Sequence, residues 1–158
     1  MFEKTESGGY TFAHNPFASP KDEYVKDLMN KKNLDSLQSL QYDLVCNGEE
    51  VGGGSIRITD PAIQRQVFRI MGYTDSKIDE QFGHLLSAYN YGAPTHGGIA
   101  LGLDRLVALV TGEDNIREVM AFPVASSGQT SVMNAPSKVD SKQLKELGIN
   151  IKADNEKE

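Results

Sequence analysis

The sequence predicts an α+β domain built on an antiparallel sheet, and two observations carry that prediction. Strand candidates mostly precede helix candidates, without the regular alternation of a doubly wound fold. Between two of the strand candidates lies Asn47-Gly48, a pair that favours a tight hairpin because both turn positions adopt positive φ. The hairpin is therefore expected at the centre of the sheet, with helices beside it.

Each predicted strand is a short run of alternating or apolar side chains bounded by Gly, Pro or Asn. These runs cover residues 10–14, 42–46, 49–58, 97–101 and 119–122. Between the first two runs, residues 20–40 are rich in Lys, Asp and Asn, with one or two helical turns around Leu28. We expect this segment to be a mobile surface loop.

Two amphipathic helices follow the hairpin. Asp60 and Pro61 supply the cap and the first position of one helix, which Gly72 ends, and the other helix starts after Thr74. Their apolar stripes are expected to cover one face of the hairpin sheet. Shorter helices are predicted at residues 103–111 and around residues 144–147.

The composition limits the classes of function. The chain has 158 residues, 39% of them hydrophobic, and a formal net charge of -6. This charge argues against a surface that coats nucleic acid, since phosphate binding needs clustered Lys and Arg. Cys46 is the only cysteine and no apolar run approaches a membrane span, so we expect a cytoplasmic protein without a membrane partner. One domain is expected over residues 1–151, and a disordered tail over residues 152–158.

Asp43 and Glu50 are the first candidates for a binding site. With a two-residue turn in the hairpin, Val45 pairs with Glu50, and Asp43 lies diagonal to Glu50 on the same face. Diagonal neighbours are roughly 7 Å apart at Cβ, so both side chains could hold one cation, such as Mg²⁺ bound to nucleotide phosphates. The alternative is a pair of solvent-facing acids on an exposed sheet.

Arg57 lies seven residues after Glu50, and an odd separation on a regular strand places it on the opposite face. A single β-bulge, which residues 52–54 would tolerate because all three are glycine, would return it to the same face. Arg57 would then be held to clamp a substrate carboxylate with two hydrogen bonds. The alternative is an Arg on the far face of a strand weakened by glycine.

Residues 97–105 contain three glycines but neither a Walker loop nor the dinucleotide glycine pattern. They predict a strand that enters a helix with Arg105 near its start, where the helix dipole and a guanidinium can act together on a phosphate. The alternative is close packing of strand and helix, with Asp104 and Arg105 as solvated charges. Among the three histidines, His14 and His96 at loop edges are better site candidates than His84 on a helix.

Several segments together resemble the bacterial aspartyl-tRNA synthetases, which are class II enzymes. The resemblance covers roughly residues 1–147 with matching order and spacing, and residues 97–105 resemble motif 3 of class II synthetases. The segments are residues 42–45 (YDLV), 47–58 (NGEEVGGGSIRI), 91–94 (YGAP), 102–105 (GLDR), 114–119 (DNIREV) and 121–123 (AFP). The resemblance implies that residues 1–151 are the carboxy-terminal portion of the class II catalytic domain, with part of its antiparallel sheet and flanking helices.

The resemblance implies roles at the ATP end of a site. Asp43 and Glu50 would hold Mg²⁺ on ATP, and the catalytic Arg105 would contact the terminal phosphates. Glu50 and Arg105 would belong to the ATP-binding set, together with Gly102, Leu103 and Asp104.

At the aspartate end, the resemblance implies that Arg57 binds the side-chain carboxylate of L-aspartate. His14 matches the first histidine of a pair that the family has near the aspartate site. Asn15 replaces the second histidine, so the contacts to the amino acid are expected to differ there.

The chain also departs from the family pattern. Nothing in it resembles motif 1, which makes the dimer interface of these homodimeric enzymes, or motif 2, whose Arg binds the α-phosphate. The anticodon-binding barrel and most of the inserted domain are missing too, and Met1-Phe2-Glu3 resembles an internal stretch of the family. We expect part of an aspartate–tRNA ligase that makes aspartyl-adenylate and charges tRNA(Asp), inactive alone. The alternatives are a non-catalytic paralogue that binds ATP or aspartate, and a class II ligase that forms an amide.

Overall fold

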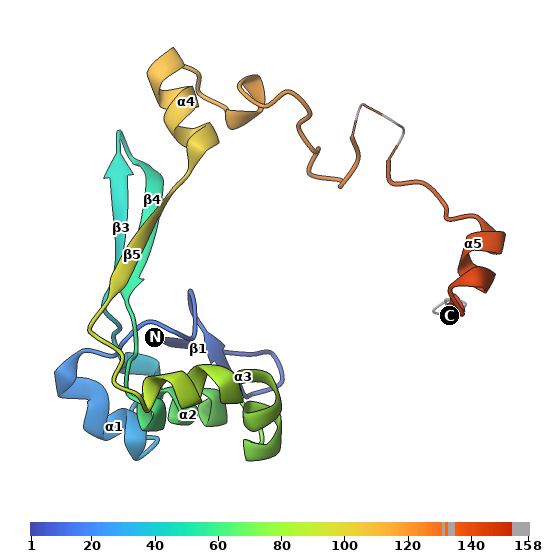
Figure 1. Cartoon of the computed structure of the whole chain (residues 1–158). Helices are drawn as coiled ribbons and strands as arrows, with labels where there is room; N and C mark the ends of the chain where they lie inside the picture. The colour runs from blue at the N-terminus through green and yellow to red at the C-terminus, as the bar shows by residue number, and fades with distance from the viewer. Residues whose placement is uncertain (131, 133–134, 153–158) are drawn as a thin grey trace. The chain divides into compact units, whose positions relative to one another are not determined.

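The computed structural model describes residues 1–130, 132 and 135–152 (Figure 1). The chain divides into two compact units, Met1–Leu106 and Val107–Glu158, and each is described by itself. The tail predicted over residues 152–158 lies, from residue 153 onward, outside the described residues. None of the described helices combines the length and the apolar character that a membrane crossing requires.

The first unit is an α+β structure with two antiparallel sheets, as the sequence predicts. Strands β1 and β2 form one sheet, and the other has the order β3-β4-β5 with antiparallel neighbours throughout. Its helices and strands are β1 (Phe2–Lys4), β2 (Tyr10–Phe12), α1 (Val25–Met29), β3 (Gln41–Cys46), β4 (Glu49–Ile56), α2 (Pro61–Ile70), α3 (Asp75–Tyr89), β5 (Gly97–Leu101) and the start of α4 (Leu103–Thr111). Single 3₁₀ turns occupy Asp22–Tyr24 and Leu34–Ser36.

The central hairpin forms as predicted. Asn47 and Gly48 have φ values of 51° and 86°, and they join β3 to β4 with Cys46 opposite Glu49 and Val45 opposite Glu50. Strand β5 then pairs with the other edge of β4. A Cβ on Gly54 of β4 would overlap the carbonyl group of Gly98 in β5, so only glycine allows this close approach.

The caps of the two long helices confirm their predicted starts. Asp60 Oδ1 accepts hydrogen bonds from the backbone N–H groups of Ala62 and Ile63 at 2.7 and 3.3 Å, and Thr74 Oγ1 accepts one from Lys77. Gly72 has a φ of 88°, the left-handed conformation that ends α2.

The prediction that these helices cover one face of the hairpin sheet is wrong. Helix α2 packs against α1 and α3, and Figure 1 shows the three helices gathered beyond one end of the sheet rather than across it. An apolar stripe on a helix does not specify which apolar surface it meets, and in α2 the buried set also includes Phe68. In this fold the helices bury their stripes against one another and against residues 20–40.

Two hydrophobic clusters hold the first unit together. Phe2, Leu28, Leu37, Ile58, Val67 and Ile70 form the first cluster. Leu28 and Leu37 are 0% and 2% exposed, so residues 20–40 are anchored in the core, and their prediction as a surface loop is wrong there. The second cluster consists of Phe68, Ile78 and Leu86. Its central ring, Phe68, stacks on Phe82 with ring centres 4.2 Å apart and meets the edge of Phe17.

The second unit has little regular structure in its described residues. Helix α4 ends before Gly112, whose φ is 76°, and a 3₁₀ turn at Ile116–Glu118 and α5 (Ser141–Glu146) follow. The predicted buried strand at residues 119–122 is absent, and Phe122 is 70% exposed. A run of apolar residues becomes a buried strand only where another strand pairs with it, and no described strand does so here.

Replacement of the central aromatic ring gives a direct test of the second cluster. We expect Phe68→Ala to lower the free energy of unfolding by about 3–5 kcal/mol, because a buried ring is lost and a cavity remains. The measurement is urea unfolding followed by circular dichroism. Phe122→Ala, the same change at an exposed ring, is the control and should cost at most about 0.5 kcal/mol. Equal losses in the two variants would contradict this description of the core.

Candidate functional site

The register of the hairpin contains one irregularity, and it decides which side chains share a face. Val45 lies opposite Glu50, but Leu44 lies opposite Gly52, so Val51 is an additional residue in β4 at this step. The backbone carbonyl of Val51 accepts a hydrogen bond from the N–H of Gly102 at 2.9 Å. A bulge that brings Arg57 to the same face as Glu50 is therefore present. It lies at Val51, one residue before the three glycines at residues 52–54, where it was expected.

The bulge places the candidate residues on one face of the sheet. Paired residues share a face, and side chains alternate along each strand. Asp43 is opposite Gly53, and from Gly53 the same face continues through Ser55 to Arg57. Without the additional residue, Arg57 would lie on the opposite face from Glu50.

The side chains of Asp43 and Glu50 both lie over Gly53. A Cβ built on Gly53 would lie 3.0 Å from Asp43 Oδ1 and 3.1 Å from Glu50 Oε1, so both oxygens approach one point above the glycine. This arrangement fits a divalent cation shared with phosphate oxygens, which needs only one or two protein carboxylates. No group of three or more His, Cys, Asp or Glu side chains that could hold a metal occurs among the described residues, so this pair would depend on a ligand for its other contacts.

Arg105 contacts the backbone of Glu50, one of the two carboxylate residues. It is in the first turn of α4, which follows β5 directly, and its guanidinium donates a hydrogen bond from Nη1 to the backbone carbonyl of Glu50. Gly102, Leu103 and Asp104 make up the junction between β5 and α4, and the side chains of Leu103 and Asp104 are exposed. The predicted ATP-binding residues are thus brought together at the hairpin end of the sheet.

Arg57 lies where β4 ends and belongs to a second group of residues. Its backbone N–H continues the ladder to β5 by donating to the carbonyl of His96 at 2.9 Å, and it forms an isolated bridge with Ala18. Its Nη1 donates a hydrogen bond to Asn15 Oδ1 at 3.1 Å. With a rise of about 3.3 Å per residue, Arg57 is about 13 Å along the strand from Gly53.

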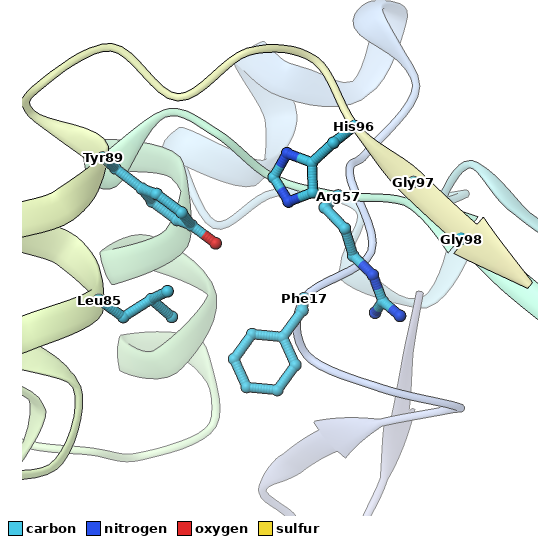
Figure 2. A pocket seen from close by; sticks show the side chains of 7 residues that line it. All are labelled: Phe17, Arg57, Leu85, Tyr89, His96, Gly97 and Gly98. Carbon is cyan, nitrogen blue, oxygen red and sulfur yellow. The ribbon is translucent and has the colours of Figure 1, made fainter. Parts of the chain in front are cut away.

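A cavity of about 470 Å³ opens beside Arg57 (Figure 2). Figure 2 shows the guanidinium of Arg57, the ring of His96 and the hydroxyl of Tyr89 around a common space, with Phe17 and Leu85 as its apolar wall. Its lining is Phe17, Arg57, Leu85, Tyr89, His96, Gly97 and Gly98. The guanidinium of Arg57 on one side and the apolar side chains of Phe17 and Leu85 on the other suit a small molecule with an anionic group.

The polar groups of the cavity influence one another. Burial raises the pKa of the Tyr89 hydroxyl, and the positive charge of Arg57 offsets part of that rise. His96 Nδ1 lies 2.8 Å from the carbonyl oxygen of Pro94. Because a carbonyl can only accept, this hydrogen bond places the proton on Nδ1 of His96.

Of the two residues predicted to bind aspartate, one lines the cavity and the other does not. Arg57 lines the cavity, whereas His14 is exposed and is not part of its lining. His96, a loop-edge candidate from the sequence, does line the cavity. Leu85 and Tyr89 are four residues apart in α3, a spacing typical of the apolar stripe of a helix. No sequence signal marks them as cavity residues, because only the packing of α3 beside the end of β4 places them there.

Two solved structures of tRNA synthetases are similar to this fold. An aspartyl tRNA synthetase from Entamoeba histolytica superimposes with a TM-score of 0.55 and 24% identity over 70% of this chain and 20% of its own. An asparaginyl-tRNA synthetase from the same organism, in complex with asparaginyl-adenylate, gives a TM-score of 0.52 at 24% identity over 76% of this chain and 23% of its own. At this level of identity the similarity shows the class II fold.

The sequence itself then shows the family. Residues 8–126 match the model of the class II tRNA synthetases (D, K and N), and the chain belongs to this family. The aspartate–tRNA ligase of Macrococcus caseolyticus is 49% identical over 98% of the chain, and the aspartate–tRNA(Asp/Asn) ligase of Prochlorococcus marinus AS9601 is 50% identical over the same share. The chain spans 26% of the length of each of these relatives.

Proposed function

We propose that the chain is part of a cytoplasmic aspartate–tRNA ligase, which activates L-aspartate with ATP and passes the aspartyl group to tRNA(Asp). The observation that carries this proposal is that Glu50, Gly53 and Arg57 lie on one face, along β4 and the residue that follows it. Relatives about half identical to the chain, both named as aspartate–tRNA ligases, support the choice of amino acid. The homodimer of the family is part of the same proposal.

The ATP end of the proposed site is the hairpin. Asp43 and Glu50 would hold Mg²⁺ through the two oxygens that meet above Gly53. The ion supplies positive charge to the phosphates when it is bound. Arg105 adds a guanidinium beside Glu50, where it would contact the terminal phosphates of ATP, and Gly102, Leu103 and Asp104 would line the nucleotide.

The aspartate end is the cavity at Arg57. Its guanidinium would bind the side-chain carboxylate through two N–H groups, a geometry that a carboxamide cannot match with both of its polar atoms. The distance of about 13 Å from Arg57 to Gly53 leaves room along the strand for the rest of the amino acid and for the phosphates. His14, which lies on the loop next to Asn15, is proposed as a further contact with aspartate.

The reaction needs no enzyme nucleophile. A carboxylate oxygen of aspartate forms a bond to the α-phosphorus of ATP, and the bond from that phosphorus to the bridging oxygen breaks, which releases pyrophosphate. The described residues hold the two ends of the substrates and stabilise charge on the terminal phosphates. We propose that the contact with the α-phosphate comes from motif 2 in a segment outside this chain, so that the chain is inactive alone.

ATP–pyrophosphate exchange with L-aspartate tests this proposal. The chain alone is expected to give almost no exchange, at least about a hundredfold below the complete enzyme, because loss of one charged contact in the transition state costs about 3 kcal/mol or more. A mixture with the preceding three-quarters of a homologous aspartate–tRNA ligase should restore exchange. Exchange by the chain alone would contradict the incomplete site. Absence of exchange in the mixture, once complex formation is verified, would favour a non-catalytic binding protein.

The role of Arg57 is tested by Arg57→Lys in the same mixture. Lysine keeps the charge but loses the planar pair of donors, so we expect weaker aspartate binding by at least about tenfold, with ATP binding unchanged. Isothermal titration with each ligand provides the measurement. Arg117→Lys, an exposed arginine in the second unit, is the matched control. Unchanged aspartate affinity in Arg57→Lys would refute the assigned role.

A further inference from the structure

We propose that Asn15 is a positioning residue that fixes the orientation of the Arg57 guanidinium and thereby sets its preference for a carboxylate. The inference rests on the proposed function in one respect, namely that Arg57 receives the side-chain carboxylate of the amino acid. It concerns the position at which the chain differs from the histidine pair of the family. The residue that replaces the second histidine is the one that contacts Arg57.

The side chain of Asn15 bridges the loop and the arginine. Its Oδ1 accepts one hydrogen bond from the backbone N–H of Phe17 at 3.0 Å and another from Arg57 Nη1 at 3.1 Å. The first bond closes a tight turn over Pro16, which holds the carboxamide in place. The second bond uses one of the five N–H donors of the guanidinium. One oxygen atom therefore ties the rotamer of Arg57 to the backbone of the loop.

The loop itself is held firmly against the end of β4. The backbone N–H of Ile58 donates to the carbonyl of Phe17 at 2.9 Å, and that of Ser19 donates to the carbonyl of Ile56 at 2.8 Å. From the other side, Gln64 of α2 is 0% exposed and donates from Nε2 to the carbonyl of Pro16 at 2.9 Å. The backbone segments that carry Asn15 and Arg57 are thus joined by hydrogen bonds, which limit the movement of one residue relative to the other.

The chemistry of the carboxamide matters as much as its position. An amide oxygen accepts a hydrogen bond without a full negative charge, so it orients Arg57 and leaves the positive charge of the guanidinium available to a ligand. A carboxylate at position 15 would orient Arg57 equally well but would compete with the carboxylate of the ligand. A residue without an acceptor would leave the guanidinium to sample several rotamers before binding.

The first experiment examines Arg57 in the ligand-free chain. In ¹⁵N-labelled protein, the side-chain signals of Arg57 are assigned by their loss in Arg57→Lys. We expect restricted rotation of the guanidinium, seen as separate Nη signals, in the wild type and in Asn15→Asp, and averaged signals in Asn15→Ala. Asn30→Ala removes another side-chain hydrogen bond of an asparagine, to the carbonyl of Lys26, and is the control that should leave Arg57 unchanged. Unchanged Arg57 signals in Asn15→Ala would overturn the proposal.

The second experiment measures affinity in the reconstituted mixture, by titration with L-aspartate and with ATP. Asn15→Ala is expected to weaken aspartate binding by about tenfold, the scale of one lost hydrogen bond to a charged group. Asn15→Asp should weaken it at least as much although Arg57 stays ordered, and ATP binding should not change in either variant. Wild-type aspartate affinity in Asn15→Asp would contradict the proposal, because a purely structural residue predicts that result. Failure of the wild type itself to bind aspartate would overturn the proposed function, while the ligand-free spectra still decide the contact between Asn15 and Arg57.

Discussion

The chemistry of this chain depends on one additional residue in one strand. Val51 has no partner in β3, and this irregularity converts the odd separation of Glu50 and Arg57 into an arrangement on one face. A regular strand would divide the two carboxylates and the arginine between opposite faces of the sheet. The proposed contacts of Glu50 with ATP and of Arg57 with aspartate depend on that register, since Glu50 lies in β4 and Arg57 follows its last residue.

The rest of the first unit supports this strand from two sides. The glycines of β4 let β5 approach closely, and β5 leads straight into the turn of α4 that carries Arg105. At the other end of the strand, α2 and α3 form the hydrophobic clusters and supply cavity and loop contacts. Phe17 belongs to both parts, because its ring meets Phe68 in the core and also lines the cavity of Arg57. The core therefore determines where the cavity beside Arg57, the proposed aspartate end of the site, is formed.

Local signals in the sequence predicted local structure well. The Asn47-Gly48 turn, the Asp60 cap and the glycine stop at Gly72 each depend on a few neighbouring residues, and the structure contains all of them. Counting residues between Glu50 and Arg57 indicated that only a bulge would bring both to one face. The count did not give the position of the bulge, because glycine tolerates a bulge without determining its place.

Features that depend on distant packing could not be predicted. Strand β1 has only three residues, too few for an alternating pattern to mark it, although Ser7-Gly8-Gly9 before β2 has the composition of a turn. The apolar stripe of a helix does not indicate which residues it packs against. The burial of Leu28 and the positions of Tyr89 and His96 in the cavity are therefore seen only in the folded structure. Residues 119–122 have the composition of a buried strand, yet none of the described strands pairs with them.

The proposed site depends on the register of the hairpin, and cross-strand NOEs in the ligand-free chain measure that register most directly. Directly opposed residues in antiparallel strands have Cα atoms only about 4.5–5.5 Å apart, so their backbone protons give distinct contacts. We expect NOEs that pair Val45 with Glu50 but Leu44 with Gly52 and Asp43 with Gly53. An uninterrupted register, with Leu44 opposite Val51 and Asp43 opposite Gly52, would place Arg57 on the other face and contradict the proposed site.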